Sequence, residues 1–329
     1  MFSANYLEFL QRFNRMKTQN AKPFLKWAGG KGQLLKEFEI RLPEEVRKGL
    51  TNTYVEPFVG GGAVYFYINN QYQFDECHIF DVNEELVLAY TVVKHDVEEL
   101  IEILKDVETT YLQLDTEKRQ EYFYEIRNKY NEFKTSIQPQ KYNKAWIRRA
   151  ADLIFLNKTC FNGLFRVNSK GEFNVPFGRH KKPQILNQEI LRNDSALLEN
   201  TSIHLGDFSD CARYVDEKTF VYFDPPYRPL NQTSSFTSYS KDRFGDEDQK
   251  RLAGFFHELD AKGAKLMLSN SDPKNEDPND HFFEDLYPEY TIDRVSARRA
   301  INCNGERRGE INELIITNYK TERNDLSVF

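Results

Sequence analysis

Four consecutive residues in the second half of the chain combine a carboxylate, two prolines and a tyrosine: Asp224, Pro225, Pro226 and Tyr227. The apolar run at 221–223 predicts a buried strand, which the prolines must end because proline cannot donate a ladder hydrogen bond. The carboxylate, a carbonyl fixed by proline and an aromatic ring are thus expected at the carboxyl end of a strand. Ligands bind at that end in open α/β sheets. The plain alternative is a stiffened turn with a surface tyrosine.

Glycines gather at residues 60–62, between a predicted strand at 53–58 and an apolar helix. This order is the first unit of a doubly wound fold, in which glycines let a cofactor approach the backbone. The dinucleotide pattern G-x-G-x-x-G is not met, because residue 65 is tyrosine. Asp81 ends the next predicted strand, 21 residues after Gly60, where an acid commonly binds ribose hydroxyls. The sequence therefore predicts a nucleoside cofactor that is not a dinucleotide.

Residues 26–32 place Trp27 and Lys31 among three glycines. A Walker phosphate loop is excluded, because the earlier glycine and the Ser or Thr after the lysine are missing. The segment still offers a flat apolar surface and a cation on a backbone that a ligand can approach closely. A plain loop before a helix is the alternative.

Positive charge is concentrated in one segment of an acidic chain. The net charge is −6, whereas residues 141–182 hold ten Lys and Arg against two acids, which gives +8 there and −14 elsewhere. Within this segment, residues 161–182 interleave glycines, asparagines, aromatics and arginines. Such a stretch can present Arg to guanine, Asn to adenine and Lys to phosphates. It indicates a polyanion-binding face, with a solvated basic helix and hairpin as the alternative.

The composition is that of a globular protein, with 329 residues, 40% hydrophobic and 29% charged. The four cysteines are far apart and form no C-x-x-C pair, so neither a disulfide framework nor a metal site is expected. No signal peptide or stretch of membrane-spanning length is recognised, and a cytoplasmic protein without membrane contact is expected.

The predicted elements place strands toward both ends of the chain and helices between them. Helices are expected at 84–94, 97–109, 116–133, 142–157, 188–199, 247–259 and 282–286, and strands at 77–80, 203–205, 220–223, 264–269, 290–295 and 311–318. The helix at 142–157 carries Lys144, Arg148 and Arg149 opposite its apolar face. Residues 228–244 predict a mobile loop, and 298–308 a second basic loop.

This order predicts one α/β domain interrupted by a smaller one. The catalytic domain comprises residues 22–83 and 200–320, and the inserted, mainly helical domain residues 84–199. Residues 1–21 are expected to form a helical extension, and residues 321–329 a tail.

Five motifs, at 26–31, 56–62, 161–166, 173–179 and 224–227, stand in the order found in one enzyme family. Over roughly residues 22–319 the chain resembles the Dam-type DNA adenine-N6 methyltransferases that act on GATC, including those of Dpn-type restriction systems. The resemblance implies a Rossmann-like S-adenosylmethionine-dependent methyltransferase sheet with helices on both faces. It assigns the inserted domain to target recognition.

The resemblance also implies roles for individual residues. The positions matching S-adenosylmethionine contacts are Trp27, Lys31, Phe58, Gly60, Gly62, Asp81, Asp207, Phe208 and Asp224. The positions matching DNA contacts are Lys26, Phe161, Asn162, Leu164, Arg166, Arg179 and Lys181, with Arg166 the expected reader of a guanine. Asn168 is a further candidate from the interleaved segment. His180 stands where the family usually has tyrosine, so readout of one outer base pair can differ, although a histidine still stacks or donates a hydrogen bond.

The implied mechanism begins with extrusion of the target adenine from the duplex. Tyr227 would stack on the base, while Asp224 and the Pro225 carbonyl accept the two amino hydrogens. The nitrogen lone pair would then point at the sulfonium methyl for direct transfer, without a metal. The implied partners are duplex DNA and a functionally paired restriction endonuclease, and a monomer is expected.

Other readings stay open from the sequence. A methyltransferase could act on another planar amino group, in RNA or in a protein amide. A DNA-binding regulator could keep the fold without catalysis, although intact residues 224–227 argue against it. A dehydrogenase is disfavoured by the missing dinucleotide pattern.

Overall fold

The computed structural model describes residues 20–133, 141–228, 244–298 and 310–321. Its chain forms two compact units. Unit 1 comprises Met1–Gly30, Gly60–Gln73 and Glu84–Ile203, and unit 2 comprises Lys31–Val59, Phe74–Asn83 and His204–Phe329. Residues 229–243 of the predicted mobile loop at 228–244, residues 299–308 of the predicted basic loop at 298–308 and residues 1–19 of the predicted extension at 1–21 lie outside the described residues.

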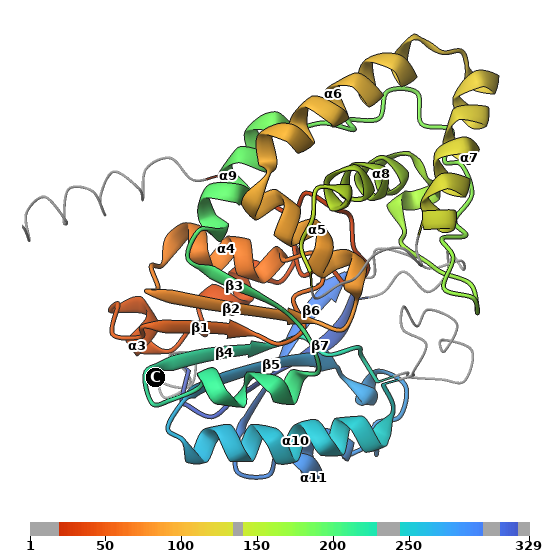
Figure 1. The fold of residues 1–329 in the computed structure, drawn as a ribbon. Coiled ribbons are helices and arrows are strands. Elements are labelled where there is room, and N and C mark those ends of the chain that lie inside the picture. The colour runs from red at the N-terminus through yellow and green to blue at the C-terminus, as the bar shows by residue number, and fades with distance from the viewer. Residues whose placement is uncertain (1–19, 134–140, 229–243, 299–309, 322–329) are drawn as a thin grey trace, which may run out of the picture. The chain divides into compact units, whose positions relative to one another are not determined.

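The sheet has seven strands in the order β3-β2-β1-β4-β5-β7-β6 (Figure 1). Their bounds are β1 Thr53–Glu56, β2 Glu76–Asp81, β3 Thr201–Leu205, β4 Thr219–Phe223, β5 Lys265–Ser271, β6 Thr291–Arg298 and β7 Glu310–Thr317. Strands β2, β1, β4 and β5 pair in parallel, and β7 is antiparallel to β5 and β6. The predicted α/β class is confirmed.

Strand β4 is buried along its whole length, as expected for a central parallel strand covered on both faces. Val221 and Phe223 point into the core that contains helix α10, Asp246–Ala261. On the opposite face, the Tyr222 ring contacts Phe38 of α2, Leu35–Glu39, with 5.3 Å between centroids. Packing on both faces fixes the strand that leads into the motif at 224–227.

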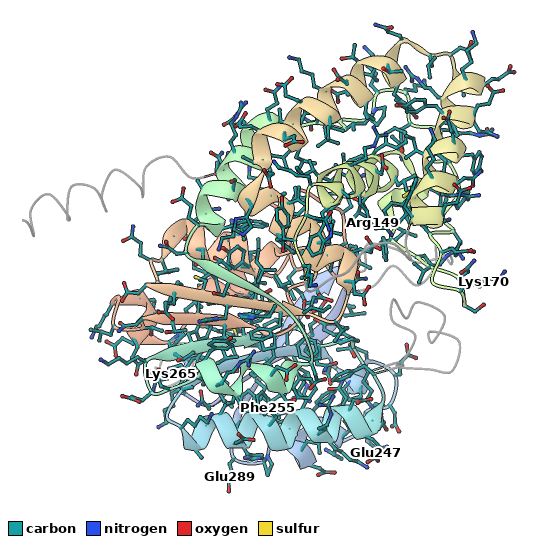
Figure 2. All side chains as sticks on the ribbon, in the orientation of Figure 1. Arg149, Lys170, Glu247, Phe255, Lys265 and Glu289 are labelled. Carbon is teal, nitrogen blue, oxygen red and sulfur yellow. The ribbon has the colours of Figure 1, made fainter. Side chains whose placement is uncertain are left out.

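Unit 2 also contains short helices around the sheet. They are α3 Glu44–Arg47, η3 Phe208–Tyr214, η5 Pro273–Asn275 and α11 Phe282–Leu286. Helix α10 carries Phe255 (Figure 2), which packs against Phe208 and Phe223, and Phe256, which packs against Phe223. These contacts position η3, which follows β3, beside the helix that follows the motif.

Unit 1 is mainly helical (Figure 1). Its helices are α4 Ala63–Gln71, α5 Glu84–His95, α6 Val97–Gln113, α7 Thr116–Glu132, α8 Ala145–Thr159, η2 Phe161–Gly163 and α9 Gln188–Leu198. Helix α8 is buried on nearly every side, because α5, α6 and α7 all pack on it. The recognition segment begins where α8 ends.

The basic face predicted on α8 is smaller than the sequence indicates. Arg149, labelled in Figure 2, is buried. It donates to both carboxylate oxygens of Glu85 at 2.9 and 2.6 Å and to the Tyr130 carbonyl. Lys144 pairs with two acids and Arg148 with Asp152. These three charges therefore have acidic partners within unit 1. The sequence shows that Arg148 and Asp152 are four residues apart on α8, but it could not show that Glu85 meets Arg149 or that Asp96 and Glu99 meet Lys144.

Among the described residues, no helix is both long and apolar enough to cross a membrane. In the same part of the chain, no group of three or more His, Cys, Asp or Glu could hold a metal ion.

Candidate active site

The carboxylate of Asp224 lies directly after β4 and is held through one of its oxygens. Oδ1 accepts hydrogen bonds from the Lys31 ammonium at 2.7 Å and from the Ser269 hydroxyl at 3.1 Å. The Tyr222 hydroxyl lies 2.8 Å from the same serine oxygen, so it donates to Ser269 while Ser269 donates to Asp224. No described residue donates to Asp224 Oδ2. The carboxylate is thus oriented through Oδ1, with Oδ2 left as an acceptor.

Of the two proline carbonyls after Asp224, one accepts a hydrogen bond from a described residue and the other does not. The Pro226 oxygen accepts from Gln249 Nε2 at 3.1 Å, and Gln249 Oε1 accepts from Asn270 at 3.2 Å. Gln249 and Asn270 are fully buried, at 0% exposure each. Within the described part of the chain, no group donates to the Pro225 oxygen. The turn therefore offers two acceptors, Asp224 Oδ2 and the Pro225 carbonyl, which is the number that one amino group requires.

Tyr227 completes the turn with an anchored ring. Its hydroxyl donates to a carboxylate oxygen of Glu313, in β7. The Lys31 ammonium lies 4.4 Å from the ring centroid, so one cation contacts both the carboxylate and the aromatic ring of the motif. The ring is neither fully exposed nor part of the apolar core.

Acidic groups crowd around Lys31, and burial shifts their titration. Burial raises the pKa of Asp224, which Lys31 and Ser269 partly offset. Burial also raises the pKa of Glu313, with Tyr227 and Lys31 opposing the shift. The pKa of Glu56, at 2% exposure, is raised furthest by burial, against the hydrogen bond from Tyr54. Mutual repulsion between Asp224 and the two glutamates adds to these shifts.

Besides Lys31 and Asp224, four more of the predicted cofactor residues lie in unit 2, at or just beyond strand ends. The Phe58 and Phe208 rings pack with centroids 5.4 Å apart. The Gly206 amide donates to the Asp81 carbonyl at 3.2 Å, which joins the chain after β3 to the end of β2. Asp207 precedes Phe208 at the start of η3. The predicted positions therefore gather around the carboxyl ends of β1, β2 and β3.

Asp207 has protein partners that the sequence did not indicate. Arg251 donates to its two carboxylate oxygens at 2.7 and 2.9 Å, and Ser209 also bonds it. These bonds, Arg251 first, lower the pKa of Asp207 to about 2. The same guanidinium lies 4.1 Å from the Phe208 ring centroid. Asp207 is therefore a fixed anion beside the aromatic pair.

The remaining predicted cofactor residues, Trp27, Gly60 and Gly62, lie in unit 1. Gly60 and Gly62 have φ angles of +49° and +74°, which favour glycine. A Cβ on Gly60 would lie 3.2 Å from the Trp27 ring, and one on Gly62 would lie 2.5 Å from the Tyr90 hydroxyl. The glycines are thus needed for internal packing, whatever they do for a cofactor. Trp27 also stacks on Phe165, with 5.0 Å between ring centroids.

The recognition segment, residues 160–182, is held mainly by its backbone. Bridges join Cys160 to Phe177 and Val167 to Phe173, and the Phe161 amide donates to the Pro176 carbonyl at 2.8 Å. Asn162 and Arg179 have φ angles of +58° and +52°, and they are the non-glycine residues with positive φ among those described. Such strain persists only where surrounding structure imposes it, and it commonly marks functional loops.

The predicted DNA-contacting side chains of this segment are largely exposed. Exposed members are Phe161, Asn162, Arg166, Arg179 and Lys181, while Leu164 is half-buried. Arg166 is steadied by a 2.8 Å bond from its Nε to Asn174. Asn168, by contrast, uses its amide on Glu172 and on backbone groups of its own turn. Its observed bonds are those of a turn residue.

His180 and Lys26 also have defined places in unit 1. The His180 Nε2 bonds the Cys160 carbonyl at 2.9 Å, which joins the two arms of the recognition segment. Lys26 is fixed through its backbone, by two bonds with the Asn157 amide. A cavity of about 390 Å³ is lined by Lys26, Lys158, His180, Lys181, Lys182, Pro183 and Gln184. Burial, with Lys26 nearby, lowers the pKa of Lys158 to about 8. The cationic side chains that line this cavity suit an anion.

Sequence reasoning missed the residues that hold the turn, namely Ser269, Asn270, Gln249 and Glu313. Two of them could have been found. Ser269 and Asn270 are polar residues at the end of the apolar strand β5, whose carboxyl end adjoins that of β4. Gln249 lies on an amphipathic helix, and no local pattern distinguishes it from a surface glutamine.

Comparison with known proteins points to one enzyme family. The family model of D12 class N6 adenine-specific DNA methyltransferases matches residues 27–301. The type II methyltransferase M.MjaIII of Methanocaldococcus jannaschii is 52% identical over 299 residues, covering 91% of this chain and 99% of its own length. The type II methyltransferase M1.LlaDCHI of Lactococcus lactis subsp. cremoris is 38% identical, with 91% and 96% covered. A DNA adenine methylase of Serratia marcescens is 34% identical, with 89% and 97% covered.

These matches confirm the resemblance to Dam-type enzymes and the predicted adenine-specific methylation of DNA, and they favour DNA over the alternative substrates. The matched region includes the motif at 224–227 and the whole recognition segment. Because the family model spans most of its length, the chain belongs to the D12 class of N6 adenine-specific DNA methyltransferases.

Proposed function

We propose that this methyltransferase transfers the methyl group of S-adenosylmethionine to the N6 of an adenine extruded from duplex DNA, within the sequence GATC. The observation that carries the proposal is the pair of acceptors at Asp224 Oδ2 and the Pro225 carbonyl, to which no described residue donates. Their neighbours on either side, Asp224 Oδ1 and the Pro226 carbonyl, are bonded within the protein.

The two acceptors address the main chemical difficulty. The lone pair of an adenine amino group is delocalised into the ring and is a poor nucleophile. Accepting both amino hydrogens favours tetrahedral geometry at N6 and directs the lone pair at the methyl carbon. Transfer forms the N6–carbon bond, breaks the sulfur–carbon bond and leaves the electron pair on sulfur. Asp224 is placed to take the proton that N6 loses, and catalysis rests mainly on positioning.

The residues proposed to hold the methyl donor fit its parts. The Phe58 and Phe208 rings offer apolar contact for an adenine, and Asp81 stands at a strand end where ribose hydroxyls commonly bind. S-adenosylmethionine supplies an electrophilic methyl group on a sulfonium. The proposed set is completed by Trp27, Lys31, Gly60, Gly62 and Asp207. The fixed negative charge of Asp207 favours contact with a polar edge or a cationic group of the methyl donor.

On the DNA side, we propose residues 84–199 as the target-recognition domain. Arg166 presents its guanidinium from an exposed loop and is oriented by Asn174, as a base-reading arginine must be. Phe161, Asn162, Leu164 and Arg179 would contact bases or sugars around it. Lys26, Lys181 and the cationic cavity would bind phosphates. The bonds of Asn168 and His180 favour a role in holding the loops over direct readout.

The names of the relatives bear on the biological setting. Two are type II methyltransferases, which supports a restriction–modification role beside an endonuclease acting on the same sequence. Others are named DNA adenine methylase, which supports adenine as the methylated base. The proposed sequence GATC rests on the motifs that resemble those of Dam-type enzymes. We propose that the enzyme works as a monomer.

The test is transfer of labelled methyl from S-adenosylmethionine to matched duplexes that contain either GATC or its scrambled form GTAC. The modified base is then mapped. We expect label only in the GATC duplex, as N6-methyladenine. Equal labelling of both duplexes would refute the proposed sequence, and label on a base other than adenine would refute the proposed reaction.

A further inference from the structure

Glu313 is the acidic partner of the motif tyrosine, and the sheet register explains how it reaches that tyrosine. Strand β7 runs antiparallel to β5 and pairs Glu313 with Ser271, the last residue of β5. Since β5 lies next to β4 in parallel register, the pairing brings the Glu313 carboxylate to the end of β4. There it accepts the hydroxyl hydrogen of Tyr227.

Its place in the strand is chemically unusual. The three residues that follow it, Leu314, Ile315 and Ile316, are at 0–1% exposure, whereas Glu313 is half-buried. A carboxylate that is partly removed from water is costly unless a hydrogen bond compensates it. The Tyr227 hydroxyl donates a hydrogen bond to this carboxylate, and nearby Lys31 forms an ion pair with Asp224 at 2.7 Å.

We propose that Glu313 is a positioning residue that fixes the Tyr227 ring in the orientation in which it stacks on the extruded adenine. The inference rests on the proposed role of Tyr227. A tyrosine ring is held along its length by packing and at its tip by its hydroxyl bond. With Glu313 at the tip and Lys31 at 4.4 Å from the ring centroid, the ring is oriented before the base arrives. Such pre-organisation reduces the ordering that binding would otherwise require.

The proposal predicts a defined energetic relation between two side chains. Tyr227→Phe keeps the ring and removes the donor, while Glu313→Ala keeps the donor and removes the acceptor. If both act through one hydrogen bond, each variant and the double variant lose the same amount, because the bond can be lost only once. Glu313→Gln retains an acceptor and should lose less than Glu313→Ala.

The experiment measures methyl transfer from labelled S-adenosylmethionine to unmethylated plasmid DNA, with kcat and KM for DNA determined separately. We expect kcat to fall about 10-fold in Glu313→Ala, in Tyr227→Phe and in their combination, with little change in KM. Glu289→Ala, an exposed acid between α11 and β6 (Figure 2), is the control and should match the wild type.

Three outcomes would overturn the inference: kcat losses that multiply in the double variant, a Tyr227→Phe variant with wild-type kcat, or a Glu313→Gln variant as impaired as Glu313→Ala. Tyr227→Ala separates this failure from that of the proposed function. If Tyr227→Ala is strongly impaired while Tyr227→Phe is not, stacking stands and only the role of Glu313 fails. If Tyr227→Ala retains wild-type kcat, the proposed role of the tyrosine fails as well.

Discussion

The turn at 224–227 and the recognition segment at 160–182 hold their functional groups in different ways. Around the turn, buried polar side chains from β5 and α10 bond the atoms on either side of the two available acceptors. In the recognition segment, the backbone is fixed by bridges and left-handed residues, and the side chains reach outward. The first arrangement defines two atoms closely. The second presents a set of side chains that can be exchanged without rebuilding the loop.

This difference has an energetic basis. A buried acceptor gains from being oriented in advance, because a buried polar group that finds no partner is costly. An exposed arginine loses little when unbound, because water bonds it. Catalysis can therefore be damaged by changes to residues that never touch DNA, such as Gln249 or Ser269. Recognition should depend on the contacting side chains one at a time.

The largest expected effect is at the turn itself. Asp224→Ala removes one acceptor and the partner of Lys31, and we expect methyl transfer to fall at least about 10³-fold. Duplex binding, measured by fluorescence anisotropy, should largely survive, because the recognition segment is unchanged. Asp285→Ala, an exposed acid in α11, is the control. If Asp224→Ala retained methyl transfer, the turn at 224–227 would not be the catalytic part of the molecule.

A smaller and more selective effect is expected in the recognition segment. Arg166→Ala should cost about 1–3 kcal/mol of discrimination at one guanine, measured as the ratio of kcat/KM for duplexes that differ at that position. Lys181→Ala is the matched contrast. It should weaken binding to all sequences alike and lower the salt slope by about 1. If Arg166→Ala also weakens all duplexes equally, Arg166 is a phosphate contact.

The smallest effect concerns the stability of the sheet-bearing unit 2. The Nδ1 atom of His78 lies 3.2 Å from the Nε2 atom of His204. Burial lowers the pKa of both histidines, and it lowers that of His204 from 6.5 to about 4. Because the unfolded chain binds more protons between pH 6.5 and 4, stability should be full above pH 6.5 and fall as pH decreases through that window. The loss should be on the order of 1 kcal/mol, since His204 is partly exposed.

This pH dependence can be measured by urea unfolding at pH 7 and pH 5. His204→Gln should reduce the difference between the two pH values. His281→Gln, an exposed histidine at the start of α11, should leave it unchanged. An unaltered difference in His204→Gln would assign the acid sensitivity to other groups.

The sequence allowed the class of fold to be predicted because apolar runs, glycine turns and prolines are local signals. Residues 221–223 and the two prolines were enough to place Asp224 at a strand end. The hydrogen bonds and ion pairs that fix these side chains could not be predicted, because they join residues far apart in the chain. Tyr227 meets Glu313 across 86 positions, and Arg149 meets Glu85 across 64. For the same reason, charge counting exaggerated the basic face, since it could not show which lysines and arginines have acidic partners.

The most direct test of the central claim is a crystal structure of the enzyme with a GATC duplex and a non-reactive analogue of S-adenosylmethionine. We expect an extruded adenine stacked on Tyr227, with N6 within hydrogen-bond distance of Asp224 Oδ2 and the Pro225 carbonyl. Gln249 should still bond the Pro226 carbonyl. An adenine whose N6 bonds the Pro226 carbonyl, or which contacts neither Asp224 nor Pro225, would contradict that claim.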